Sequence, residues 1–167
     1  MAAPKIRLAL ACLALGTASC AGVMNWLDRP FRSPGERLKD FPESVWNEYT
    51  CDEQELPFFE IERLELYPRR LKPGEQFGHR LVYVLCPERT TGVVTGELQT
   101  RILFRGTPIV HSADARYDLK PGRWVVDAFI ELPPTAEMGV YALELQFASR
   151  SIQFERSLVF AVESADD

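Results

Sequence analysis

Several features that would point to a biochemical activity are missing from this sequence. It has only two histidines, His79 and His111, and no Gly-x-Ser-x-Gly segment, so no hydrolytic triad is indicated. We interpret His79, which lies in an apolar stretch, as a core residue. His111 with Asp114 or Asp118 matches no standard metal-ligand spacing. We therefore expect no enzyme, cofactor or metal, and an unrecognised hydrolase is the remote alternative.

The sequence also lacks an excess of positive charge. The sequence has 19 basic and 24 acidic residues. If the first residues, with Lys5 and Arg7, are left out, 17 basic and 24 acidic residues remain, and the net charge is −7. Nucleic acid needs a basic footprint, and an anionic lipid surface attracts basic segments, so we expect neither partner. One acidic run could attract calcium but lacks the Asp/Asn-and-Gly loop of such sites, so we interpret it as a solvated face. The run consists of Glu48, Asp52, Glu53, Glu55, Glu60 and Glu62.

The first residues have the order of an export signal. Lys5 and Arg7 come first, an apolar stretch over residues 8–15 follows, and small residues lead to Cys20. This is the order of a secretory signal peptide, and its apolar stretch is shorter than the roughly 20 residues that cross a bilayer. We expect residues 1–19 to be removed, which leaves 148 residues, the size of one domain.

The end of this signal, Thr17-Ala18-Ser19-Cys20, resembles the lipobox of bacterial lipoproteins. The family usually has Leu where this chain has Thr17. The resemblance implies that the Cys20 sulfur receives a diacylglycerol, that cleavage precedes Cys20, and that the new amino terminus is acylated. Ala21 is not the Asp that signals inner-membrane retention in proteobacterial families, so the resemblance implies the periplasmic leaflet of the outer membrane. The alternative is ordinary cleavage after Ala18 or Ala21, which would release a soluble periplasmic or secreted protein.

The number of cysteines agrees with lipidation of Cys20. Cys12 lies in the signal, so Cys20, Cys51 and Cys86 remain, and an odd thiol is unfavourable in an oxidising compartment. If Cys20 is lipidated, Cys51 can pair with Cys86. Such a disulfide would close a loop of about 36 residues and contribute about 3–4 kcal/mol to stability. The alternative is two unpaired buried cysteines.

The remaining chain divides by composition into four parts. We expect a tether over residues 20–40, where Pro30, Pro34 and Gly35 resist helix formation. Residues 41–57 contain one predicted short helix, Pro42–Tyr49, with Trp46 facing inward. A β-domain over residues 58–163 and an acidic tail over residues 164–167 complete the predicted organisation.

From Phe58 onward, apolar residues recur with a period of two, which predicts β-strands. Both registers of residues 76–86 are apolar, so we expect that strand to be central and covered on both faces. Pro-Gly turns at Pro73-Gly74 and Pro121-Gly122 punctuate the pattern. The pattern predicts about seven strands, over residues 61–67, 76–86, 94–105, 109–112, 124–132, 140–148 and 151–162.

Residues 137–143 resemble the segment that enters strand F of immunoglobulin-type domains. The resemblance makes Tyr141 the corner tyrosine whose hydroxyl bonds back to nearby backbone, and puts Leu143 where antibody domains have cysteine. It implies an all-β, immunoglobulin-like β-sandwich of about seven antiparallel strands. Such a fold says little about function. Together these features suggest an envelope lipoprotein, anchored through Cys20, whose sandwich binds or scaffolds another envelope component. A soluble binding protein, for example an inhibitor of a protease or lysozyme, is the alternative.

Overall fold

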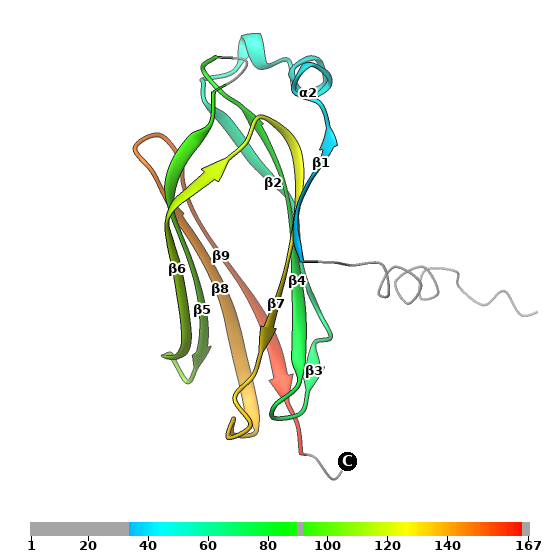
Figure 1. Cartoon of the computed structure of the whole chain (residues 1–167), viewed down its shortest axis with the longest axis vertical. Coiled ribbons are helices and arrows are strands. Elements are labelled where there is room, and N and C mark those ends of the chain that lie inside the picture. Colours follow the sequence, from blue (N-terminus) through cyan, green and yellow to red (C-terminus); the bar gives the residue numbers. More distant parts are fainter. Residues whose placement is uncertain (1–33, 90–91, 165–167) are drawn as a thin grey trace, which may run out of the picture. The chain divides into compact units, whose positions relative to one another are not determined.

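The computed structural model describes residues 34–89 and 92–164. These residues form strands, one α-helix and one 3-10 helix (Figure 1). The elements are β1 (Gly35–Asp40), α2 (Pro42–Glu48), η2 (Cys51–Glu53), β2 (Phe58–Tyr67), β3 (Arg70–Leu71), β4 (Gln76–Cys86), β5 (Val94–Phe104), β6 (Thr107–Leu119), β7 (Gly122–Glu131), β8 (Gly139–Ala148) and β9 (Gln153–Val162).

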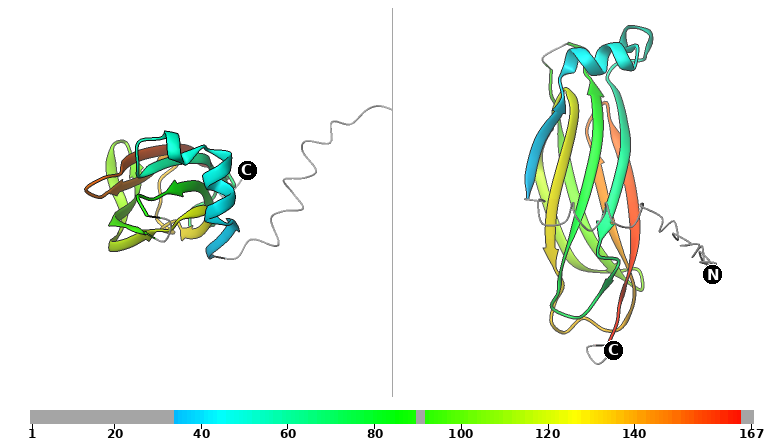
Figure 2. Two further views of the ribbon diagram at one scale, coloured as in Figure 1. Left: turned by 90° about the horizontal axis from the view of Figure 1, so that it is seen from above. Right: turned by 90° about the vertical axis from the view of Figure 1, so that its right-hand side faces the viewer.

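The strands form two facing sheets, which makes the domain an all-β sandwich, as predicted (Figures 1 and 2). The first sheet has the order β1-β7-β4-β2 and the second has the order β3-β9-β8-β5-β6. Neighbouring strands are antiparallel except β3, which runs parallel to β9. If β2, β4 and β7 are taken as strands A, B and E, and β5, β8 and β9 as C, F and G, the arrangement is the immunoglobulin one. In this arrangement β1 lies beside β7, where strand D would be.

The predicted tether is wrong at its carboxyl end, because Gly35–Asp40 forms β1 and pairs with β7. The predicted number of strands is also too low, since the described residues contain nine. β1 is an edge strand whose side chains are mostly exposed, so its sequence needs no apolar alternation. β3 has only two residues, too few for any pattern. The rest of the predicted tether, residues 20–33, and residues 165–167 of the predicted tail lie outside the described residues, as does Cys20.

The core lies between the sheets, and β4 contributes to it as expected for a central strand. The side chains of Phe77, Leu81, Tyr83 and Leu85 are buried on the inner face. On the outer face Val84 and Cys86 are also buried, because α2 and η2 cover that end of the sheet. The sandwich therefore has one end that is covered by helices, and we call it the helix end.

The predicted helix is present as Pro42–Glu48, with Pro42 in its first turn. The expectation that Trp46 faces inward is met only in part, because Trp46 packs against the buried cluster around Val45 but stays half-buried. The fully buried residue of the helix is Val45, which packs against Val84 and the disulfide. The Trp46 indole instead donates a hydrogen bond to Asp52 Oδ1 at 2.8 Å, so Trp46 lines the surface beside the helix.

Candidate functional site

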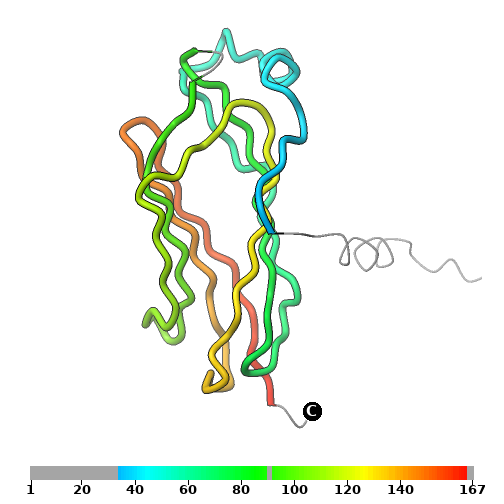
Figure 3. The backbone as a smooth tube through the Cα atoms, in the orientation of Figure 1, coloured from blue at the N-terminus to red at the C-terminus, as the bar shows by residue number. Residues whose placement is uncertain are grey.

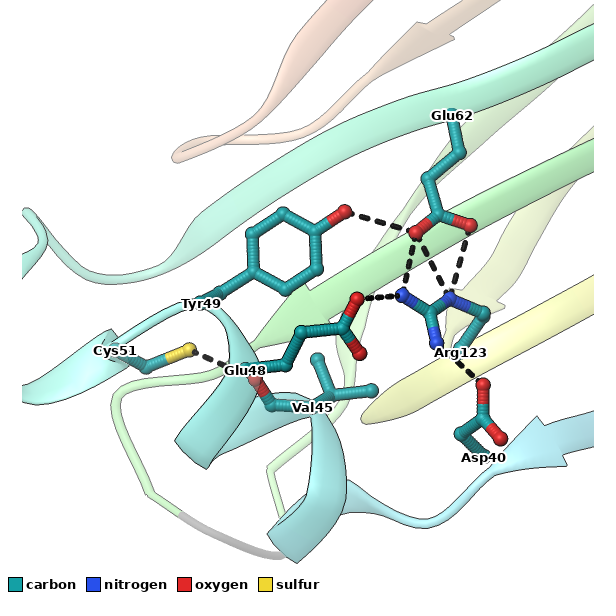
Figure 4. A network of polar contacts seen from close by, with 7 residues as sticks. All are labelled: Asp40, Val45, Glu48, Tyr49, Cys51, Glu62 and Arg123. Atoms are coloured by element: carbon teal, nitrogen blue, oxygen red, sulfur yellow. Dashed lines mark hydrogen bonds and ion pairs between the residues drawn. The ribbon is translucent and has the colours of Figure 1, made fainter.

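Arg123, at the start of β7, forms the centre of an ionic network at the helix end (Figure 4). Three elements each bring one carboxylate to its guanidinium. Glu62 of β2 accepts from Nε at 2.8 and 2.9 Å, and Glu48 of α2 accepts from Nη2 at 2.7 Å. Asp40 at the end of β1 accepts from Nη1. One side chain thus joins the first strand, the helix and the first sheet.

Burial makes this network electrostatically strong. Arg123 is only 8% exposed, and the hydrogen bonds to Glu48 and Glu62 raise its pKa. Burial alone would raise the pKa of Glu62, but hydrogen bonds from Arg123 and Tyr49 outweigh burial and lower that pKa. The Tyr49 hydroxyl donates to Glu62 Oε1 at 2.8 Å, and burial together with this bond raises the pKa of Tyr49 to about 12. Arg123, Glu62 and Tyr49 therefore each keep one protonation state at neutral pH, which suits a structural clamp.

A disulfide fixes the segment next to this network. Cys51 of η2 is joined to Cys86 at the end of β4, 35 residues later, as the sequence predicted. Both cysteines are buried, with Val45 and Val84 around them. The bond attaches the helical segment to the central strand, while Arg123 attaches it to β2 and β7.

Further ion pairs secure β1 along its length. Arg37 pairs with Asp127 at 3.1 Å, and Asp127 also accepts from Arg80 at 2.7 Å on the outer face of the sheet. Glu36 pairs with Lys120. We call residues 35–53 the strap, because backbone pairing, ion pairs and the disulfide tie it to the sandwich from end to end (Figure 3).

Gly122 permits the close approach of the strap. It has φ of +98°, a conformation that favours glycine, and a Cβ at this position would lie 2.7 Å from the Asp40 carbonyl oxygen. The predicted Pro121-Gly122 turn thus does more than reverse the chain. It brings the backbone of β7 against the junction between β1 and α2, which places Arg123 beside Asp40.

Two hollows lie at the helix end and meet at Pro87. The first is an apolar groove of about 220 Å³ beside α2, and the second is a more polar hollow of about 420 Å³ between the β4–β5 and β8–β9 connections. We call them together the helix-end cleft. The groove is lined by Pro42, Glu43, Trp46, Asn47, Leu85 and Pro87. The charged residues of the second hollow are Glu88, Arg89 and Arg150.

The other residues that the sequence analysis identified lie apart from this cleft. The Tyr141 hydroxyl donates to the Glu137 carbonyl oxygen at 2.7 Å, a backbone bond of the kind that the resemblance implies. Tyr141 and Leu143 are both buried in the inter-sheet core. This arrangement stabilises the entry to β8 and offers no reactive group.

The two histidines are on different sheets. His79 of β4 is buried, and its Nδ1 has no hydrogen-bond partner among the described residues; burial lowers its pKa to about 4. His111 is exposed on β6. No group of three metal-ligating side chains occurs among residues 34–89 and 92–164. Within the acidic run, Glu48 and Glu62 bind Arg123 and Asp52 binds Trp46, so these three are partners of specific groups instead of a purely solvated face.

Sequence reasoning missed Arg123, although a signal was present. Arg123, Val125 and Asp127 alternate with Trp124 and Val126, so the second register of β7 carries opposite charges on either side of a valine. A strand in the middle of a sheet rarely carries charges without partners. This pattern indicates an ionic network but does not say which residues complete it.

In the part of the chain that the structure describes, no helix has the length and apolar character to cross a bilayer. No protein-family model and no curated protein matches the sequence.

Solved structures show weak, partial similarity. A cycloisomaltooligosaccharide glucanotransferase of Paenibacillus sp. aligns with a TM-score of 0.47 and 16% identity, over 65% of this chain and 14% of that one. An alkylpurine DNA glycosylase of Pseudomonas fluorescens aligns with a TM-score of 0.45 and 10% identity, over 63% and 30%. A β-glucosidase of Erythrobacter marinus aligns with a TM-score of 0.44 and 10% identity, over 64% and 16%. The chain spans less than a third of each of these proteins, and values this low carry no information on activity.

Proposed function

We propose that this chain is a lipid-anchored protein of a bacterial cell envelope, whose β-sandwich binds or scaffolds another envelope component. The observation that carries the proposal is the order of the first 20 residues, in which a positive segment, a short apolar stretch and small residues end at Cys20. Diacylglycerol on the Cys20 sulfur and an acyl group on the new amino terminus form the anchor. Because Ala21 follows, the anchor belongs to the outer membrane and the domain faces the periplasm.

The disulfide supports the anchor by elimination. Cys51 and Cys86 are paired, so Cys20 is the one remaining cysteine once residues 1–19 are removed. A free thiol at that position would be reactive in an oxidising compartment, whereas a thioether to lipid is inert. Lipidation therefore gives every cysteine of the processed chain a stable chemical state.

The charge of the chain agrees with anchoring by acyl chains. With a net charge of −7 after processing, the chain gains nothing from an anionic surface, so hydrocarbon must supply the attachment. Each buried methylene contributes about 0.8 kcal/mol, and two or more chains are needed for stable attachment. The lipidation pattern supplies that number.

The strap supports the idea of a domain held close to its membrane. β1 begins at Gly35, and 14 residues separate Cys20 from it, so that the distance from Cys20 to Gly35 at full extension is roughly 50 Å. From Gly35 onward the chain is fixed to the sandwich by pairing with β7 and by Arg123. The strap would therefore transmit any pull from the anchor directly to the folded domain, a suitable property for a scaffold.

Replacement of Cys20 by Ser tests the anchor. In the host the parent chain should sediment with membranes after a high-salt wash, while the Cys20→Ser chain should move to the soluble periplasmic fraction. A Ser19→Gly chain, which keeps a small residue before Cys20, serves as the control and should remain in the membrane fraction. Retention of the Cys20→Ser chain in washed membranes would show that the proposal is wrong.

Mass spectrometry of the processed amino terminus distinguishes the soluble alternative. An amino terminus at Cys20 carrying the mass of lipid supports the anchor. A free amino terminus at Ser19 or Gly22 would instead show cleavage by ordinary signal peptidase, and the chain would then be a soluble binding protein.

A further inference from the structure

The apolar groove of the helix-end cleft is shaped for one large side chain. Trp46 is half-buried at its wall, and its indole N–H is already bonded to Asp52, so the ring offers an apolar contact. Leu85 and Pro87, both buried, contribute to the lining. The groove volume of about 220 Å³ is below the roughly 300–1,000 Å³ of sites for drug-sized ligands. The groove therefore fits an anchoring side chain better than a free small molecule.

The neighbouring hollow offers two guanidinium groups. Arg89 and Arg150 are exposed, and no carboxylate of residues 34–89 or 92–164 forms an ion pair with either. Arg123, by contrast, already forms ion pairs with three carboxylates. A guanidinium fork matches the geometry of a carboxylate. Two such forks within one hollow favour an acidic group as their partner.

The second hollow concentrates positive charge on a chain that is acidic as a whole. The processed chain carries a net charge of −7, and Arg89 and Arg150 place two positive charges in one hollow. Glu43 and Glu88 also line the cleft, so the preference should be moderate. The two guanidinium groups next to the groove favour a protein segment that carries carboxylates over a neutral glycan.

We infer that the helix-end cleft binds an extended segment of a partner protein, in which a large apolar side chain stands next to carboxylates. The apolar side chain enters the groove beside Trp46, and the carboxylates pair with Arg89 and Arg150. This deepens the proposed function, on which it rests for the presence of a partner in the envelope, by naming the chemistry of that partner.

A peptide array tests the inference in solution. The protein is the processed chain, residues 20–167, with Cys20→Ser so that it needs no detergent. The probes are hexapeptides of glycine that carry Phe, Leu or Ala at one position, next to two Asp, two Asn or two Lys. We expect binding to be strongest for Phe or Leu with Asp, and about three- to tenfold weaker when Asn replaces Asp. Replacement of the apolar residue by Ala should weaken binding more than tenfold.

Variants locate the binding on the cleft. Asn47→Trp places a large ring at the groove from an exposed helix position and should abolish binding while the domain stays folded. Arg89→Glu with Arg150→Glu should reverse the preference from Asp to Lys peptides. The control is Arg69→Ala with Arg116→Ala, which removes two exposed arginines outside the cleft and should leave binding unchanged.

Three results would overturn the inference. These are binding that does not depend on the apolar residue, binding that survives Asn47→Trp, and binding of an oligosaccharide panel in place of the peptides. Since the chain used here carries no lipid, none of these results bears on the anchor, which the fractionation of the Cys20→Ser chain tests separately.

Discussion

Charged side chains on the outer face of the first sheet are buried to an unusual degree. Arg80, Arg123 and Asp127 are 7%, 8% and 4% exposed. Burial of an isolated charge is costly, and each of these side chains is paired through two or more polar contacts. At the residue scale, therefore, the attachment of the strap depends on a few buried charges, and each of them would be costly to bury without its partner.

Arg123→Leu should destabilise the domain by about 2–3 kcal/mol, because it leaves three carboxylates close together without a cation. The effect stays below the largest values for buried pairs because the side chain of Glu48 is 53% exposed and can be hydrated. Chemical denaturation at pH 7 measures the loss. Arg70→Leu removes an exposed ion pair with Glu163 and should cost less than about 1 kcal/mol. Equal losses in the two variants would contradict the special role of Arg123.

His79 should make stability depend on pH. Its pKa falls from 6.5 when unfolded to about 4 in the fold, so between these values the unfolded chain binds the proton and the folded chain does not. Stability is therefore complete above pH 6.5 and decreases as the pH falls to about 4, by about 3 kcal/mol.

Denaturation curves between pH 7.5 and 4 check this. His79→Leu should flatten the slope and stay within about 1 kcal/mol of the parent at pH 7.5, since Nδ1 of His79 bonds to no group in the described part of the chain. His111→Gln, at an exposed position, should keep the parental slope. A His79→Leu chain with an unchanged slope would contradict the assignment.

At the scale of elements, the strap is joined to the sandwich by three kinds of interaction. Backbone pairing holds β1 against β7, Arg123 holds the end of α2, and the disulfide holds η2. α2 has two turns and would not be stable alone. Its stability must come from Val45 and Trp46, which pack with the disulfide and Val84, and from the ion pair of Glu48 with Arg123.

Replacement of Cys51 and Cys86 by Ala should cost about 3 kcal/mol, because the unfolded chain regains the freedom of a loop of 35 residues. The loss should appear first in the strap. In hydrogen exchange, the amides of α2 and η2 should lose protection, while those of β8 and β9 keep it. An equal loss of protection throughout the domain would show that the strap does not open independently of the sandwich.

At the scale of the whole molecule, the proposed targeting segment and the folded domain occupy separate parts of the sequence. The segment that we propose to be an export signal, and Cys20 after it, precede the described domain in the sequence, and the sandwich begins at Gly35. In the function that we propose, lipid on Cys20 is the attachment of this acidic domain to a membrane, and the residues beside Cys20 would decide which membrane receives it. If the proposal is right, substitutions beside Cys20 should change the location of the protein without any effect on folding.

Ala21→Asp should move the protein from the outer to the inner membrane, because Asp after the lipidated cysteine is the retention signal of the family that residues 17–20 resemble. Density-gradient separation of the two membranes measures the shift. Ala21→Ser should remain in the outer membrane, and the melting temperature of all three chains should agree. If Ala21→Asp and its parent share one membrane, the sorting proposal is wrong.

The strands could be read from the sequence because a period of two is a local property. Residues 76–86 are apolar in both registers, and the structure buries both faces of β4. The pairing of Cys51 with Cys86 followed from counting cysteines, and the helix followed from Pro42. These features depend on neighbours in the chain or on small numbers of candidates, so little tertiary information is needed.

The strap, the Arg123 network and the cleft were decided only by the tertiary structure. Arg123 bonds to Asp40, Glu48 and Glu62, which precede it by 83, 75 and 61 residues. Each of these carboxylates looks like an ordinary surface residue until the sheet brings β1, α2 and β2 together. The cleft likewise needs α2 and two distant connections to meet at one end of the sandwich. Polar partnerships have no periodicity in sequence, whereas burial of an apolar face does, and for that reason the sequence determined the strands and only the fold determined what they bring together.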